Sequence, residues 1–184
     1  MASAVDLTFG EVERVLMKLH GVVGEKRRVT LRSRLQHLQR AEFPPGVKVG
    51  RGPKVSYGTD PFFQLVVALQ LAEARLPPVH AARVVLANWH ILRRFVDDGI
   101  ARHLAGVGAA AQPDRWCVVE LAGLSGLRAE GEDEVERVQE VAAAVLVAEF
   151  LGAAPPPRGP RLLVDVIGVT VRALEAVVAD REKR

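Results

Sequence analysis

Residues 30–45, TLRSRLQHLQRAEFPP, decide how the N-terminal half of this chain folds. The leucines recur at i, i+4 and i+7, which is the spacing of one buried stripe on a helix: Leu31, Leu35 and Leu38. Thr30 belongs to the residue types that cap helices, and the prolines at the end of the stretch cannot continue one. We therefore predict a helix from Thr30 to about Glu42.

The face opposite the leucine stripe is polar. A rotation of about 100° per residue puts four side chains on that face, with Arg32 at its flank: Ser33, Gln36, His37 and Arg40. Arginine can contact guanine, glutamine can contact adenine, and serine or histidine can contact either base edges or phosphates. The pattern favours a helix that enters a DNA groove.

The surrounding segment is strongly basic. Between residues 26 and 58 there are nine basic residues and one acidic residue, a net charge of +8 in a chain whose net charge is +3. The bases are Lys26, Arg27, Arg28, Arg32, Arg34, Arg40, Lys48, Arg51 and Lys54. Such a concentration is typical of a surface that contacts the phosphate backbone, although a solvated face would carry the same charge.

The elements on either side complete a recognisable order. Thr8 and Glu11 form a capping box for a first helix that extends to Leu19, and a basic loop at residues 25–28 follows it. After the second helix, valines flank a Gly-Arg-Gly-Pro turn, so residues 47–57 are expected to form a hairpin. Two helices followed by a basic hairpin is the order of a winged helix-turn-helix, in which one helix enters the major groove.

Residues 35–45 resemble the recognition-helix signature of the MerR family, leucine-arginine-tyrosine-tyrosine-glutamate-x-x-glycine-leucine and then proline. Leu35 and Phe43 match its apolar anchors, while Gln36 and His37 replace its arginine and first tyrosine with other hydrogen-bonding side chains. Tyr57 matches the tyrosine that closes the family's wing. The resemblance covers about residues 8–86.

Several residues depart from that family pattern. Leu38 replaces the second tyrosine, Glu42 replaces the glycine, and the first helix is longer than usual. The resemblance implies a sequence-specific, dimeric transcription regulator that binds double-stranded DNA. The DNA-binding residues expected from the helix, the basic segment and the family pattern are Arg27, Arg28, Thr30, Arg32, Ser33, Gln36, His37, Arg40, Lys48, Arg51, Lys54 and Tyr57.

Downstream, we predict a third helix from residue 59 or 60 to 76 and a long fourth helix over residues 78–104, which could leave the first domain and pack against another chain. A β-α-β-α unit then follows, with strands at 115–121 and 161–167 and helices at 132–151 and 169–181; parallel and antiparallel pairing are both open. The fold class is thus mostly α with some β (α+β), comprising a winged helix-turn-helix, a long connecting helix and a small C-terminal unit.

These elements suggest three segments. Residues 1–86 form the DNA-binding domain, 87–112 a connecting helix and linker, and 113–184 a unit for dimerisation or for binding a protein partner. We expect the apolar half of the 132–151 helix, together with a stripe around Trp89 and Leu92, to form a homodimer interface.

Other function classes find less support. The lone Cys117 excludes an internal disulfide, the five histidines are scattered, and no metal site or cofactor is expected. No signal peptide or membrane span is recognised, so we expect a cytoplasmic, nucleoid-associated protein. An excisionase-like or architectural DNA-binding protein of a phage or mobile element is the alternative. An enzyme or ligand-binding module is less favoured, because only Ser125 and Thr170 follow the predicted strands as polar groups.

Overall fold

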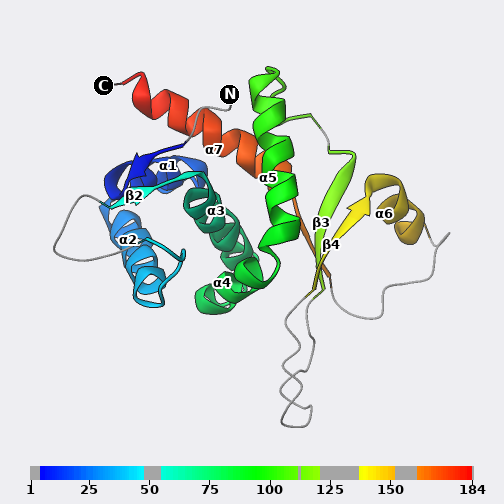
Figure 1. Ribbon diagram of the computed structural model, residues 1–184, viewed down its shortest axis with the longest axis horizontal. Coiled ribbons are helices and arrows are strands. Elements are labelled where there is room, and N and C mark those ends of the chain that lie inside the picture. Colours follow the sequence, from blue (N-terminus) through cyan, green and yellow to red (C-terminus); the bar gives the residue numbers. More distant parts are fainter. Residues whose placement is uncertain (1–4, 48–54, 112, 121–136, 152–160, 184) are drawn as a thin grey trace, which may run out of the picture.

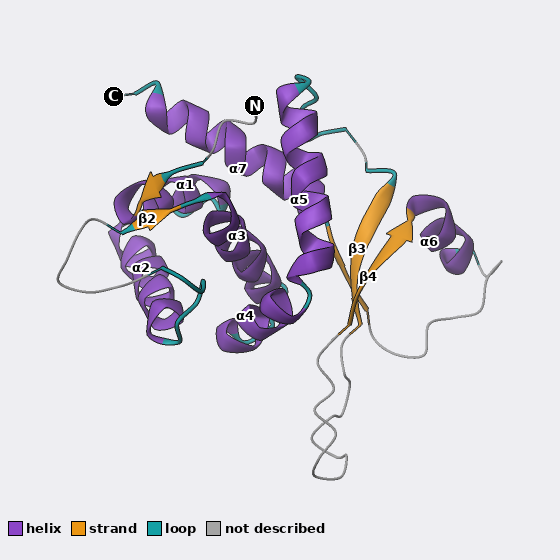
Figure 2. Ribbon diagram, in the orientation of Figure 1, coloured by secondary structure: helices purple, strands orange, loops and turns teal. Residues whose placement is uncertain are grey.

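A computed structural model describes residues 5–47, 55–111, 113–120, 137–151 and 161–183. The described part holds seven helices and two small antiparallel sheets, which confirms the mostly helical α+β class (Figures 1 and 2). None of the described helices is long and apolar enough to cross a lipid bilayer.

The first two helices pack against each other. Helix α1 (Phe9–Leu19) begins at the predicted capping box, where the Thr8 hydroxyl accepts from the Glu11 amide and the Glu11 carboxylate accepts from the Thr8 amide. Helix α2 (Glu25–Arg40) packs against α1 and α4. The prediction that α2 starts at Thr30 was wrong, because Gly24, at φ +91°, completes the turn and residues 25–28 already form helix.

The expected hairpin is only partly described. Residues 48–54, which include its tip, lie outside the described residues. Strand β2 (Ser56–Tyr57) pairs antiparallel with β1 (Leu7–Thr8), which precedes α1. The chain before the first helix therefore supplies a strand partner that the sequence pattern did not reveal.

The long fourth helix is in fact two helices. Helix α3 (Thr59–Glu73) is followed by α4 (Pro78–Ala87) and, after a break at Asn88, by α5 (Trp89–Leu104). The buried Asn88 amide donates to the Val84 carbonyl, and its oxygen accepts from the Val138 amide at 3.3 Å. The side chain thereby ends α4 and ties the break to the C-terminal sheet.

The C-terminal segment contains one more strand than predicted. Strand β3 (Arg115–Glu120) lies in the middle of a three-stranded antiparallel sheet, between β4 (Arg137–Ala142) and β5 (Arg161–Val164). The prediction of one helix over 132–151 was wrong, because residues 137–142 pair with β3 and only α6 (Ala143–Phe150) is helical. Of the two pairings left open, the sheet adopts the antiparallel one.

Helix α7 (Val166–Arg181) returns to the N-terminal half. It packs against α1, α3 and α5, and crosses α5 in Figure 1. Arg14 on α1 donates to both carboxylate oxygens of Asp180 on α7, at 2.8 and 3.0 Å. The segments expected at residues 1–86, 87–112 and 113–184 thus share one hydrophobic core.

This packing also corrects the expected path of the fourth helix. Leu92 and Phe95 on α5 are each 1% exposed and belong to the shared core. The apolar stripe of α5 is therefore covered by this chain's own helices, α7 among them, instead of reaching toward another chain.

Candidate nucleic-acid interface

Helix α2 has one buried and one exposed face, as the leucine spacing predicts. Its leucines are almost completely buried: Leu31, Leu35 and Leu38. The opposite side chains are all exposed: Ser33, Gln36, His37 and Arg40. Within the described part of the chain, none of these four makes a hydrogen bond or an ion pair, so their polar groups are available to a ligand.

A buried carboxylate holds α2 against α1. Glu13 on α1 is 2% exposed. Arg32 donates to its two oxygens at 3.1 and 2.6 Å, and Arg28 donates to one of them at 3.2 Å. We call this group the Glu13 clamp. The two arginine side chains remain 42–46% exposed, so each can also face a phosphate.

The clamp keeps Glu13 ionised. Burial raises the pKa of Glu13, but the hydrogen bonds and positive charges of Arg32 and Arg28 outweigh this effect and hold the pKa below its ordinary value. The burial of Glu13 could have been inferred from the sequence, because Glu13 flanks the apolar stripe of the first helix. Sequence reasoning missed it because nothing there identified the arginines as partners.

Two other expected contact residues lie elsewhere on α2. The Thr30 hydroxyl donates to the Lys26 carbonyl one turn earlier, so Thr30 is an interior helix residue and not a cap. Arg27 is exposed and lines, with Arg34, a cavity beside α3. Arg27 therefore belongs to a different flank from Ser33 and Arg40.

Tyr57 is a core residue. It is 1% exposed, and its hydroxyl accepts a hydrogen bond from the Gln39 side chain. Burial raises the pKa of the Tyr57 phenol, and the Gln39 hydrogen bond partly opposes that change. We correct its expected role. Tyr57 pairs with Leu7 of β1 and is buried, so its side chain is not exposed for contact with DNA. Its hydroxyl instead holds the Gln39 side chain near the end of α2.

The end of α2 adopts a Schellman motif. The Phe43 amide donates to the Leu38 carbonyl and the Glu42 amide to the Gln39 carbonyl, both at 3.0 Å. Glu42 has φ +57°, a left-handed conformation that favours glycine.

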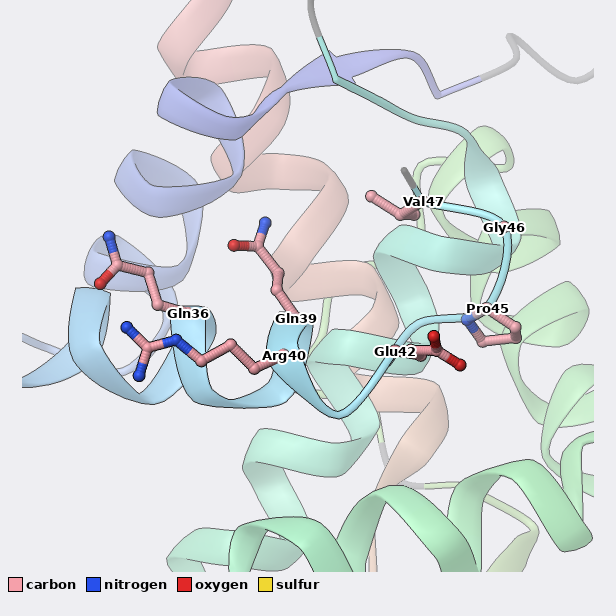
Figure 3. A pocket seen from close by; sticks show the side chains of 7 residues that line it. All are labelled: Gln36, Gln39, Arg40, Glu42, Pro45, Gly46 and Val47. Atoms are coloured by element: carbon pink, nitrogen blue, oxygen red, sulfur yellow. The ribbon is translucent and has the colours of Figure 1, made fainter. Parts of the chain in front are cut away.

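A groove adjoins the end of α2 (Figure 3). The Arg40 side chain extends along the helix toward Gln36, and both lie on the same side of it, while Glu42 lies on the loop that follows. The lining residues are Gln36, Gln39, Arg40, Glu42, Pro45, Gly46 and Val47. The groove thus combines amide and guanidinium donors with a single carboxylate.

The expected wing contacts, Lys48, Arg51 and Lys54, lie outside the described residues. No group of three or more potential metal ligands occurs in the part of the chain that the structure describes. Cys117 is buried in β3, and burial raises the pKa of its thiol to about 12.

No family model matches the chain, and no curated protein matches its sequence. The MerR-like resemblance therefore rests on the residues quoted above.

Proposed function

We propose that the protein is a sequence-specific regulator of transcription that binds double-stranded DNA through α2. The observation that carries the proposal is the exposed face of this helix. Ser33, Gln36, His37 and Arg40 have no described partner, and their polar groups match the donors and acceptors that base edges present in the major groove.

The Glu13 clamp supports the same function. A helix that contacts bases must be held at a fixed angle, because a misplaced donor loses its hydrogen bond. Arg28 and Arg32 fasten α2 to α1 through Glu13 while remaining partly exposed. The proposed division is that Arg28 and Arg32 position the protein on phosphates, and that Gln36 and Arg40 contact bases.

We also propose that the protein binds DNA as a homodimer through its C-terminal unit. Four apolar side chains of α6, its C-cap and β5 are 47–73% exposed: Val145, Val147, Leu151 and Leu163. Arg161 on β5 donates to Glu149 on α6 at 3.0 and 3.1 Å, which connects the two elements. A second copy would remove this apolar surface from water. Sedimentation as a monomer at micromolar concentration would refute the dimer.

Selection of bound duplexes from genomic DNA tests the proposed function. The retained fragments should share a short motif, arranged for a dimer as an inverted repeat with half-sites about 10 base pairs apart or a multiple of that spacing. Recovery without any shared motif would instead indicate binding to phosphates alone, and the proposed sequence specificity would be wrong.

A single substitution separates base contact from phosphate contact. Arg40→Ala should weaken binding to the selected motif by about 1–3 kcal/mol if Arg40 contacts a base, with a smaller effect on unrelated DNA. Arg94→Ala is the matched control, because Arg94 is also an exposed arginine (61%) but lies on α5 and not on α2. Its guanidinium is 3.9 Å from the Glu140 carboxylate. The control should bind both duplexes like the wild type.

A further inference from the structure

A second site lies on the other flank of α2. A cavity of about 240 Å³ is bounded by the end of α1, residues 27–34 of α2 and the last turns of α3. Its apolar lining comes from all three parts: Val22 after α1, Leu31 on α2 and Leu69 on α3. The volume is below the range usual for drug-sized ligands, so the cavity fits a molecule about as large as a single ring or a short chain.

Two guanidinium groups stand at the same cavity. Arg27 and Arg34 are seven residues apart, which places them on one side of α2 about two turns from each other. Both side chains are exposed, and neither has a partner in the described part of the chain. A planar guanidinium with free donors binds a carboxylate through two parallel hydrogen bonds.

The remaining charge in the wall is already engaged. His20 Nδ1 lies 2.7 Å from a carboxylate oxygen of Glu73, and the His20 side chain is 7% exposed. Two arginines and one glutamate line the cavity, so positive side chains outnumber negative ones and an anionic ligand is its complement. His20 Nε2 is buried without a hydrogen-bond partner among the described residues, so the polar groups of this wall are not fully paired by the chain itself.

We propose that this cavity binds a small amphipathic monocarboxylate. The apolar body lies against Val22, Leu31 and Leu69, and the carboxylate binds Arg27 or Arg34. The site goes beyond the proposed DNA binding and does not depend on it, because it uses a different flank of α2. If both functions hold, one helix connects the ligand to the DNA-contacting face.

The test uses benzoate and hexanoate as probes, with benzamide and hexanamide as uncharged matches of the same shape. Each is titrated into the full chain without DNA, and amide chemical shifts are followed by NMR. We expect saturable shifts at Val22, Thr30 and Leu69 with a Kd of about 1 mM or tighter for at least one acid, and binding at least about tenfold weaker for its amide.

Variants then assign the charge. Arg27→Ala and Arg34→Ala together should weaken acid binding by about tenfold or more and leave the melting temperature unchanged, since both side chains are exposed. Arg34→Lys keeps the charge without the planar fork and should lose part of the affinity. Arg94→Ala should bind like the wild type.

Either of two results would overturn the proposal. One is the absence of saturable shifts around the cavity with both acids, and the other is equal binding of acid and amide. Neither result bears on DNA binding, which is measured separately, so failure of the ligand site and failure of the proposed function are distinguishable.

Discussion

The crossing of α5 and α7 gives a sharp test of the packing that joins the two halves of the chain. Gly99 on α5 lies against α7 so closely that a Cβ atom added there would be 2.6 Å from the Thr170 Cβ and 2.9 Å from the Ile167 carbonyl oxygen. Carbon atoms in good contact are about 3.5–4.0 Å apart, so Gly99→Ala forces the helices to separate by roughly 1 Å.

The expected cost follows from two opposing effects. Overpacking of a well-packed core costs about 1–3 kcal/mol, and this case belongs near the top because one of the clashing atoms is backbone. Replacing glycine by alanine inside a helix stabilises the folded state by about 1 kcal/mol. Gly99→Ala should therefore destabilise the protein by about 1–2 kcal/mol, which lowers the melting temperature by about 2–8 °C for a chain of this size.

Thermal and urea unfolding followed by circular dichroism measure this change. Gly10→Ala is the matched control, because the nearest atom to its added Cβ would be the Arg14 Nη1 at 3.7 Å, and it should be neutral or stabilising by up to about 1 kcal/mol. Thr170→Ser removes one clashing methyl group, so it should reduce the cost of Gly99→Ala in the double variant. A Gly99→Ala protein as stable as the wild type would refute the described crossing.

Three further predictions concern the end of α2, the Glu13 clamp and Cys117. Glu42→Gly should stabilise the protein by about 0.5–1 kcal/mol, because glycine adopts the left-handed conformation at φ +57° without strain. Gly106→Ala should destabilise it, because Gly106 has φ +70° in the same motif after α5. Denaturant unfolding measures the free energy of unfolding of both variants. Glu13→Gln should lower the melting temperature at pH 7, and this difference from the wild type should shrink below about pH 4. The reason is that the folded protein lowers the pKa of Glu13. Such a carboxylate stabilises the fold above its unfolded pKa, and this stabilisation is lost as the pH falls through its folded pKa. A melting difference that does not change with pH would contradict the ionised clamp. Cys117 should react with a thiol reagent at pH 8 only as fast as the protein unfolds, because its side chain is 1% exposed and burial raises its pKa to about 12. Fast labelling of the native protein would place the thiol at the surface.

Much of α2 was predictable because its determinants are local. The leucine spacing set the buried face of the helix, and the side chains opposite it are exposed as expected. The capping box at Thr8 fixed the start of α1 in the same way. In each case the physical cause lies within one or two helical turns of the residue concerned.

The departures have causes that are distant in sequence. Asn88 breaks the predicted long helix where its side chain binds Val138, fifty residues away. Residues 137–142 form a strand because β3 offers an edge for pairing, and helix propensity gave no sign of it. Tyr57 matches a family pattern, yet its pairing with Leu7 buries it. Such contacts are set by tertiary packing, which overrides local preference.

The most direct test of DNA binding replaces the exposed face of α2 as a unit. Ser33, Gln36, His37 and Arg40 are changed together to alanine, and affinity for the duplex selected by the wild type is measured by fluorescence anisotropy at fixed salt concentration. These side chains have no described partner, so folding should change little, and circular dichroism checks this. We predict a loss of affinity of about 5- to 150-fold for each base contact removed, with Arg94→Ala unchanged. A folded fourfold variant that binds the duplex as tightly as the wild type would contradict the assignment of α2 as the DNA-contacting helix.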